Sequence, residues 1–242
     1  MPDSAKKGKA LHDPASFQIF PLGDAAIVIK FGDTIDRELH RSVRALENYF
    51  VDHSLHGMIE RVPAYATVTI YYDPAQRSYH DLEQELRKIL AELADVPELD
   101  SRIVEIPVSY GGEFGPDLEF VAQHNSLKTD EVVQIHSAPD YLVYMIGFAP
   151  GFPYLGGMSQ RIAAPRRDSP RLKIPVGSVG IAGTQTGVYP IETPGGWQLI
   201  GRTPIKLFRP REIPPTLLKA GDIVRFRPIS SEEFTSLRAC SQ

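Results

Sequence analysis

The residues best suited to chemistry lie between positions 147 and 204, where glycine, proline, aromatic and basic residues alternate. In residues 147–157, Phe148, Pro150 and Phe152 are interleaved with glycines. Glycine permits tight turns, proline stiffens the backbone, and aromatic rings offer flat apolar surface. This segment predicts either a rigid rim beside a ligand pocket or a loop whose rings plug the end of a barrel.

A second segment, residues 164–175, is a proline-bracketed loop rich in basic side chains. Its cations are Arg166, Arg167, Arg171 and Lys173. From residue 141 to 211 the only acids are Asp168 and Glu192, although the whole chain has a net charge of -4. Arginine binds carboxylate and phosphate through paired hydrogen bonds. We therefore predict an anionic ligand here; the alternatives are a solvated basic loop or a seat for the acidic face of a partner subunit.

The third segment, residues 175–204, carries many glycines, and uncharged polar side chains lie among them. Its spacing matches neither a phosphate-binding loop nor a dinucleotide fingerprint, so barrel corners explain most of the glycines. Gln185 and Tyr189 are suited to bind an amide. The candidate substrate-binding residues are Phe148, Pro150, Phe152, Arg166, Lys173, Gln185, Tyr189 and Arg202. We expect Arg166, Lys173, Gln185 and Arg202 to converge at the mouth of the barrel.

Other residue types restrict the mechanism. All seven histidines lie at or before His136, which excludes a serine–histidine triad within the following barrel segment, and surface or capping roles are expected for them. Cys240 is the only cysteine, so no disulfide is expected within the chain. No metal site is expected, and no residue can be assigned as catalytic.

These segments need elements to position them, and the periodicity predicts two domains. Residues 1–13 read as a flexible tail. Residues 14–110 predict a hairpin at 17–31, a helix at 35–50, a strand at 67–72, a helix that starts at Ser78 and a strand at 102–108. This alternation is typical of an α+β domain of ferredoxin-like type.

Residues 111–242 predict a mainly β domain with a helical hairpin at its start. The hairpin, residues 117–136, superficially resembles a DNA-binding helix-turn-helix. Asp130 and Glu131 begin its second helix, where they would repel phosphates, so we interpret the hairpin as a packing element. Short apolar strands at 141–148, 178–182, 187–191, 197–200, 205–208 and 222–226 then alternate with Gly and Pro turns, as in a closed barrel.

The composition is ordinary for a soluble globular protein. The chain has 242 residues, of which 42% are hydrophobic and 23% charged. Its net negative charge argues against nucleic acid and anionic membranes as partners. No apolar run is long enough to span a membrane and no signal peptide is evident, so a cytoplasmic location is expected.

The segments 147–157, 164–175, 177–189 and 194–204 resemble the 5-oxoprolinase B-subunit family, also known as the KipI or allophanate hydrolase subunit 1 type, with a carboxyltransferase domain of subdomains C and D. The resemblance implies a cyclophilin-like barrel behind the α+β domain. It implies work beside a homologous-fold protein of the KipA or C-subunit type and a third oxoprolinase component. Together such proteins open 5-oxoproline to L-glutamate with ATP hydrolysis, so ATP is expected at the level of the complex and the chain alone should be inactive.

Two alternatives remain open. Related sequences form part of allophanate- or urea-type hydrolases and carboxyltransferases, but this chain has no Ala-Met-Lys-Met biotin-attachment motif. One member of the family inhibits a sensor histidine kinase, for which Phe148, Phe152 and Tyr154 offer an apolar surface. Co-purification with its partners, followed by an assay of ATP-dependent 5-oxoproline cleavage, distinguishes the oxoprolinase hypothesis from both.

Overall fold

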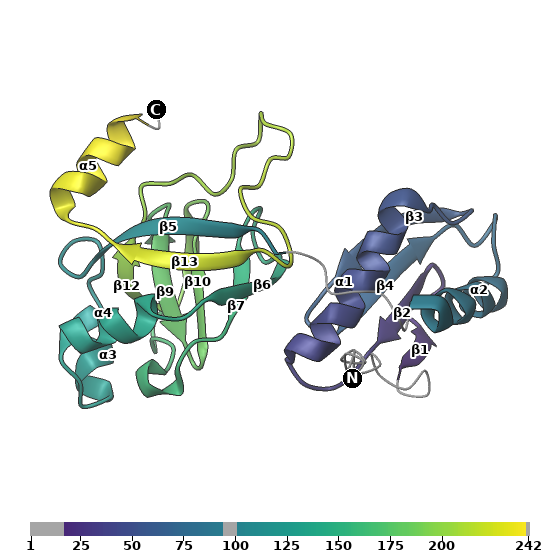
Figure 1. Ribbon diagram of the computed structural model, residues 1–242, viewed down its shortest axis with the longest axis horizontal. Coiled ribbons are helices and arrows are strands. Elements are labelled where there is room, and N and C mark those ends of the chain that lie inside the picture. Colours follow the sequence, from purple (N-terminus) through teal and green to yellow (C-terminus); the bar gives the residue numbers. More distant parts are fainter. Residues whose placement is uncertain (1–16, 94–100, 241–242) are drawn as a thin grey trace, which may run out of the picture. The chain divides into compact units, whose positions relative to one another are not determined.

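The computed structural model describes residues 17–93 and 101–240 (Figure 1). Contacts divide the chain between residues 100 and 101 into two compact units, and each is described by itself. The tail expected at residues 1–13 lies outside the described residues. Among the residues described, no helix is long and apolar enough to cross a membrane.

The first unit is a four-stranded antiparallel sheet with two helices. Its strands are β1 (Gln18–Pro21), β2 (Ala26–Lys30), β3 (Met58–Pro63) and β4 (Thr67–Tyr72), in the spatial order β1-β2-β4-β3. The helices are α1 (Arg37–Asp52) and α2 (Tyr79–Glu92). The hairpin, both helices and the strand at 67–72 therefore confirm the sequence prediction, whereas β3 was missed.

Local signals explain the two helices. The Asp36 carboxylate accepts a hydrogen bond from the backbone N–H of Glu38 at 2.7 Å and so caps α1. The Ser78 hydroxyl caps α2 by accepting from the N–H of Asp81. Behind the caps, apolar residues at three- and four-residue spacing are buried against β2 and β4. These buried residues are Leu39, Val43, Leu46, Phe50, Leu82, Leu86 and Ile89.

The ferredoxin-like expectation is not confirmed, because the chain order differs. A ferredoxin-like domain runs βαββαβ, whereas the first unit runs ββαββα, with both strands of its first hairpin before α1. The strand expected to complete this domain, β5 (Ile103–Tyr110), belongs to the second unit, where it pairs in parallel with β13 (Ile223–Pro228). The predicted boundary at residue 110 is therefore wrong, and the second unit begins at Ser101.

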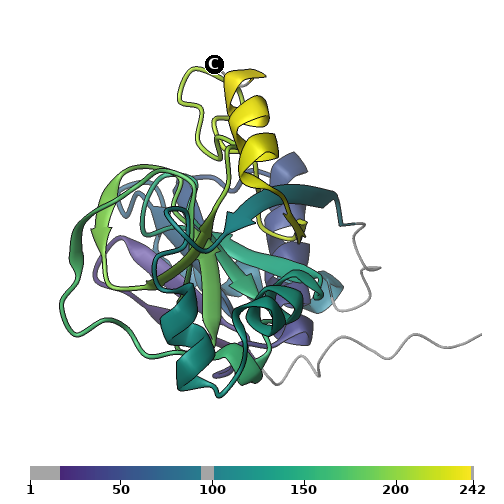
Figure 2. The same ribbon diagram turned by 90° about the vertical axis from the view of Figure 1, so that its left-hand side faces the viewer.

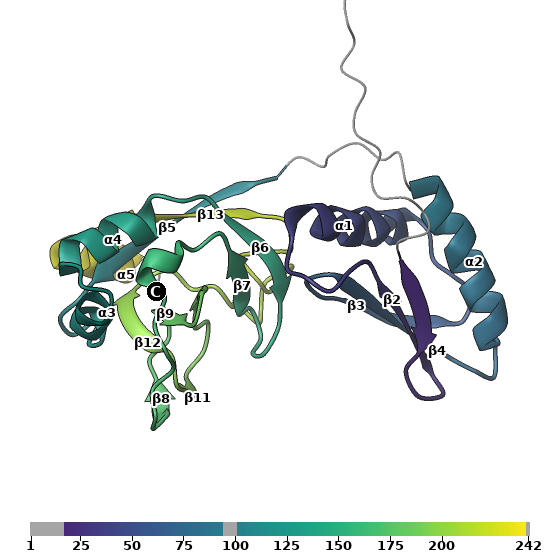
Figure 3. The same cartoon turned by 90° about the horizontal axis from the view of Figure 1, so that it is seen from below.

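The second unit is a closed β-barrel, as expected, with the strand order β10-β7-β6-β13-β5-β12-β9. The remaining barrel strands are β6 (Tyr141–Ile146), β7 (Pro153–Gly156), β9 (Ser178–Ala182), β10 (Gln185–Val188) and β12 (Gln198–Arg202). A separate two-stranded ribbon, β8 (Arg171–Ile174) with β11 (Thr193–Gly195), projects from the barrel in Figure 3. The barrel interior is apolar, with Ile106, Val108, Val179, Ile181 and Val224 all buried.

Helices cover the outside of the barrel. The predicted hairpin is present as α3 (Leu118–His124) and α4 (Thr129–Ser137), which lie against β12 and β13. A 3-10 turn, η3 (Gln160–Ile162), adjoins α4. Figure 2 shows this hairpin and α5 (Ser231–Cys240) on opposite sides of the barrel. The expected strand at 205–208 is absent, and those residues begin a long loop that returns to the barrel.

Candidate functional site

A small cavity of about 190 Å³ lies where three segments of the barrel unit meet. The segment after β6 contributes Phe148 and Phe152, and strand β10 with its following residue contributes Gln185 and Tyr189. Arg166 enters from the basic loop. Tyr154 and residues 194–197 complete the wall. The cavity therefore combines an arginine, an amide and a phenol with aromatic rings.

Phe152 is the centre of the aromatic wall, and only 2% of its surface is exposed. Its ring meets four others edge to face, an arrangement that aromatic quadrupoles favour. The centroid distances are 5.4 Å to Phe148, 5.3 Å to Tyr154, 5.4 Å to Tyr189 and 5.6 Å to Trp197. Phe152 therefore packs in a buried apolar cluster with Tyr189 and Trp197 and also lines the cavity.

Phe148 forms the open rim of the cavity. Its side chain is 64% exposed, and its backbone φ of 64° lies in the left-handed region that non-glycine residues seldom adopt. The loop maintains this conformation through a hydrogen bond from the Gly147 N–H to the Phe152 carbonyl at 3.0 Å. Non-glycine residues in this backbone region cluster at active sites and ligand-binding loops.

Tyr189 supplies a neutral polar group to the cavity wall. Burial raises the pKa of its phenol to about 12, although Arg166 and Arg171 nearby oppose that shift. The hydroxyl therefore stays protonated at neutral pH and can both donate and accept a hydrogen bond. Gly195 permits this arrangement, because a Cβ there would lie 2.7 Å from the Tyr189 oxygen.

A buried carboxylate, Asp117, fixes the basic loop beside the cavity. Asp117 is 6% exposed, and its Oδ1 accepts from Arg167 Nη1 at 3.1 Å and from Arg171 Nη2 at 2.8 Å. Its Oδ2 accepts from the N–H of Leu199 in β12 at 2.7 Å. Two of the four predicted loop cations thus bind an internal acid. Both arginines stabilise the loop that carries Arg166, and a ligand would have to compete with Asp117 for them.

The structure brings together five of the eight candidate residues: Phe148, Phe152, Arg166, Gln185 and Tyr189. Pro150 is exposed and lies outside the cavity wall. Lys173 is 78% exposed and pairs with Glu192 at 3.1 Å. Arg202 donates from Nε to the Val176 carbonyl at 2.8 Å. The expected convergence of Lys173 and Arg202 with Arg166 is therefore not observed, and substrate binding by the other five stays a prediction.

Sequence analysis missed three parts of this site. Trp197, the only tryptophan, follows a Gly-Gly pair, and its rarity was an available signal. Tyr154 was named for the apolar surface of the kinase alternative but not as a substrate-binding residue. Asp117 offered no local signal, because its partners are 50 to 82 residues away along the chain.

His136 corrects the expectation that every histidine has a surface or capping role. It is fully buried in the barrel unit, where its ring contacts those of Tyr141 and Phe226. Its Nδ1 lies 2.8 Å from the Tyr110 hydroxyl and its Nε2 lies 2.9 Å from Thr186 Oγ1. Because Thr186 donates to the Gly180 carbonyl, His136 Nε2–H donates to Thr186 and the Tyr110 hydroxyl donates to Nδ1. Burial lowers the pKa of His136 to about 3, so the ring is neutral.

The carboxyltransferase domain family, subdomain C and D, matches residues 17–218. The chain is 54% identical to the 5-oxoprolinase B-subunit of Bacillus subtilis (strain 168), over 90% of this chain and 95% of that protein. A conserved uncharacterized protein from Pyrococcus horikoshii is 50% identical, with 90% of this chain and 100% of that chain covered and a TM-score of 0.55. Urea carboxylase of Kluyveromyces lactis has the same fold at 21% identity and a TM-score of 0.75, over 93% of this chain and 23% of that chain.

The fold and these matches define a carboxyltransferase-type protein with subdomains C and D. Within that class, the chain belongs to the 5-oxoprolinase B-subunit family.

Proposed function

We propose that this chain is the B-subunit of an ATP-dependent 5-oxoprolinase, which opens 5-oxoproline to L-glutamate. The observation that carries the proposal is the 54% identity to a 5-oxoprolinase B-subunit over 95% of that protein. The same proposal includes three further points: the barrel is cyclophilin-like, the protein is cytoplasmic, and the complex uses ATP.

The cavity fits the chemistry of 5-oxoproline, a five-membered lactam with one carboxylate. The cavity volume of about 190 Å³ is below that of pockets for drug-sized ligands and suits a small ring. Arg166 is the cation of the wall and would bind the carboxylate through paired hydrogen bonds. Gln185 and the neutral Tyr189 hydroxyl would bind the lactam group, while Phe152 and Trp197 would contact the apolar ring carbons.

This wall orients a ligand but does not supply a nucleophile with an adjacent base. Its only groups that titrate are Arg166, Tyr154 and Tyr189, and burial raises the pKa of Tyr189 further from neutrality. We therefore assign this chain the binding and orientation of the lactam. Activation by ATP and hydrolysis require partners, namely a homologous-fold protein of the KipA or C-subunit type and a third oxoprolinase component, and the isolated chain should be inactive.

The test uses the assembled oxoprolinase with Arg166→Gln in this chain and Lys173→Gln as the matched control. Both substitutions remove one cation of the same loop, but only Arg166 lines the cavity. Arg166→Gln should lower kcat/KM for 5-oxoproline by about ten- to a hundred-fold, the range expected for a lost charge-assisted hydrogen bond. Lys173→Gln should leave kcat/KM within about two-fold, because exposed ion pairs contribute little.

Size-exclusion chromatography of both variants controls for assembly. Equal catalytic efficiency in the Arg166→Gln and wild-type complexes would refute the carboxylate-binding role. Assembly of the wild-type complex without any ATP-dependent turnover of 5-oxoproline would refute the proposed function itself. Turnover of urea or allophanate by that assembly would instead support the urea-type alternative.

A further inference from the structure

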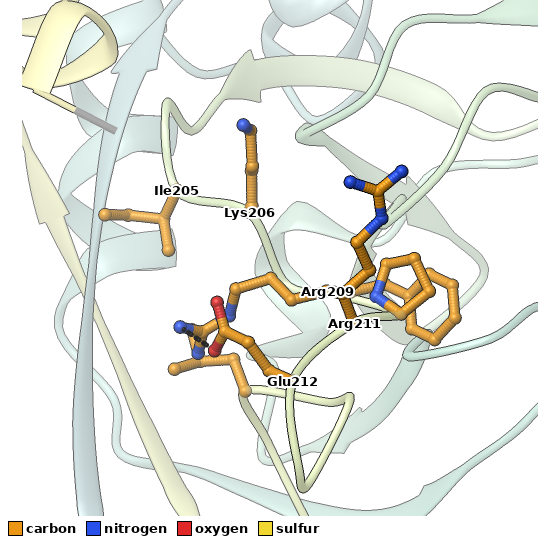
Figure 4. A pocket seen from close by; sticks show the side chains of 8 residues that line it. Ile205, Lys206, Arg209, Arg211 and Glu212 are labelled. Atoms are coloured by element: carbon orange, nitrogen blue, oxygen red, sulfur yellow. Dashed lines mark ion pairs between the residues drawn. The ribbon is translucent and has the colours of Figure 1, made fainter. Parts of the chain in front are cut away.

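A second and larger cavity, of about 610 Å³, lies in the barrel unit outside the site described above. Its cations are Lys206, Arg209 and Arg211, and its only acid is Glu212 (Figure 4). Ile205, Phe208, Pro210 and Leu217 form its apolar surface. The cavity has no lining residue in common with the aromatic cavity.

The cations stand on a loop that its own hydrogen bonds hold together. The N–H of Leu217 donates to the Leu207 carbonyl at 2.8 Å, and the N–H of Arg209 donates to the Pro215 carbonyl at 2.7 Å. At the base of the loop, Leu207 and Leu218 are each 1% exposed and belong to the barrel core. This loop connects β12 to β13 along the chain and is the yellow-green segment that rises above the barrel in Figure 1. These contacts therefore fix the loop backbone from which the three cationic side chains extend.

Only one of the three cations is neutralised within the cavity. Arg209 Nη1 pairs with Glu212 at 2.7 Å, and Arg211 turns away from that pair in Figure 4. In the part of the chain that the structure describes, no ion pair involves Lys206 or Arg211. Arg209 Nε is buried there without a hydrogen-bond partner. Buried donors are normally satisfied, so this atom together with two unpaired cations indicates a site for an anion.

We propose that this cavity binds a phosphate-bearing small molecule. Glu212 neutralises one of the three cations, which leaves two positive charges in the cavity. Two positive charges match a phosphate dianion or a pyrophosphate better than a ligand with a single carboxylate. An ammonium and a guanidinium in the wall of one cavity also suit an oxyanion with several acceptors. The volume lies within the range of ordinary small-molecule pockets, so a phosphate with an attached organic group also fits.

The two cavities are neighbours through a close contact between their loops. A Cβ at Gly151, whose φ is 82°, would lie 3.1 Å from the Cβ of Phe208. Gly151 belongs to the loop that carries Phe148 and Phe152, whereas Phe208 lines the larger cavity. A phosphate bound beside Phe208 would therefore lie next to the loop that shapes the aromatic cavity.

The test is isothermal titration of the full-length chain with inorganic phosphate, pyrophosphate and ATP, each without metal. The double variant Lys206→Gln/Arg211→Gln removes the two unpaired cations. The matched control Arg161→Gln/Lys219→Gln removes one exposed arginine and one exposed lysine that line neither cavity. Pyrophosphate should bind the wild-type chain, and its Kd should rise about ten-fold or more in the double variant, as expected for lost charge-assisted hydrogen bonds.

The control variant should keep the wild-type Kd, and added salt should weaken binding to the wild type. Tighter binding of ATP than of pyrophosphate would identify a nucleotide as the source of the phosphate, whereas equal affinities would identify the phosphate groups alone. Absence of phosphate and pyrophosphate binding would overturn the proposal, as would equal losses in the two double variants. Loss of complex assembly in the double variant, without phosphate binding by the wild type, would assign these cations to a protein interface instead. None of these measurements depends on oxoprolinase activity.

Discussion

Acid should destabilise the barrel unit through His136, the buried histidine of that unit. Burial lowers the pKa of folded His136 to about 3, whereas an unfolded histidine has a pKa near ~6.5. Below pH 6.5 the unfolded state therefore binds a proton that the folded state excludes, and stability falls as pH decreases toward 3. The aromatic neighbours Tyr110 and Tyr141 have raised pKa values and stay neutral throughout, so neither offsets this loss.

The size of the effect follows from the two pKa values. A pH of 5 lies about 1.5 units below the pKa of an unfolded histidine. Protonation of the unfolded state therefore lowers the free energy of unfolding by roughly 2 kcal/mol relative to pH 7. With a urea dependence of ~2 kcal/mol per molar, the unfolding midpoint should fall by about 1 M. Trp197 is the only tryptophan and lies in the barrel unit, so its fluorescence reports the unfolding of that unit.

Two substitutions isolate the contribution of His136. His136→Gln removes the titrating group, so the difference in stability between pH 7 and pH 5 should shrink by about 2 kcal/mol relative to wild type, whatever its own stability. His124→Gln, at an exposed position in α3, should keep the wild-type pH dependence. If wild type and His136→Gln lose the same stability between pH 7 and pH 5, the assignment of a neutral buried His136 is refuted.

Two further predictions concern the aromatic cavity. Asp117→Asn removes the charge that holds Arg167 and Arg171, so it should destabilise the barrel by about 2–3 kcal/mol in urea unfolding. It should also raise the KM of the assembled enzyme more than it lowers kcat, and an unchanged KM would contradict a role in positioning Arg166. Gly187→Ala would place a Cβ 2.8 Å from Cζ of Phe152, so the Phe152 ring must shift. Because that ring contacts Trp197, the fluorescence emission of Trp197 should change and 5-oxoproline turnover by the complex should fall. Unaltered emission and turnover would contradict the packing described for Phe152.

The elements that sequence analysis predicted correctly are those whose signals are local. Asp36 and Ser78 begin helices with capping side chains, and apolar residues repeat along each helix at fixed spacing. The domain boundary failed for the opposite reason. Strand β5 pairs with β13, and Arg102 at its start binds Asp222, 120 residues further along the chain. No pattern within residues 102–110 distinguishes a strand of the first sheet from a strand of the barrel.

The same distinction applies to the site. Residues 147–157 carry an unusual composition, and the rings of Phe148, Phe152 and Tyr154 in the cavity wall come from that segment. His136 and Asp117 acquire their roles only from contacts with distant strands, since Thr186 is 50 residues from His136 and Leu199 is 82 residues from Asp117. Burial and hydrogen bonding, rather than residue type, define what these two side chains do.

The number of basic residues in a segment does not by itself predict an anion site, because acids of the same chain already pair with some of these cations. In the basic loop, Arg167 and Arg171 bind Asp117, and Lys173 pairs with Glu192. Arg166 is the remaining arginine of that loop, and it is the one that lines the aromatic cavity. In the same way, Lys206 and Arg211 remain at the larger cavity, after Glu212 has paired with Arg209. One arginine in a small aromatic cavity suits a monoanion, whereas two cations in a larger cavity suit a dianion, so the two proposed anion-binding positions differ in both size and charge.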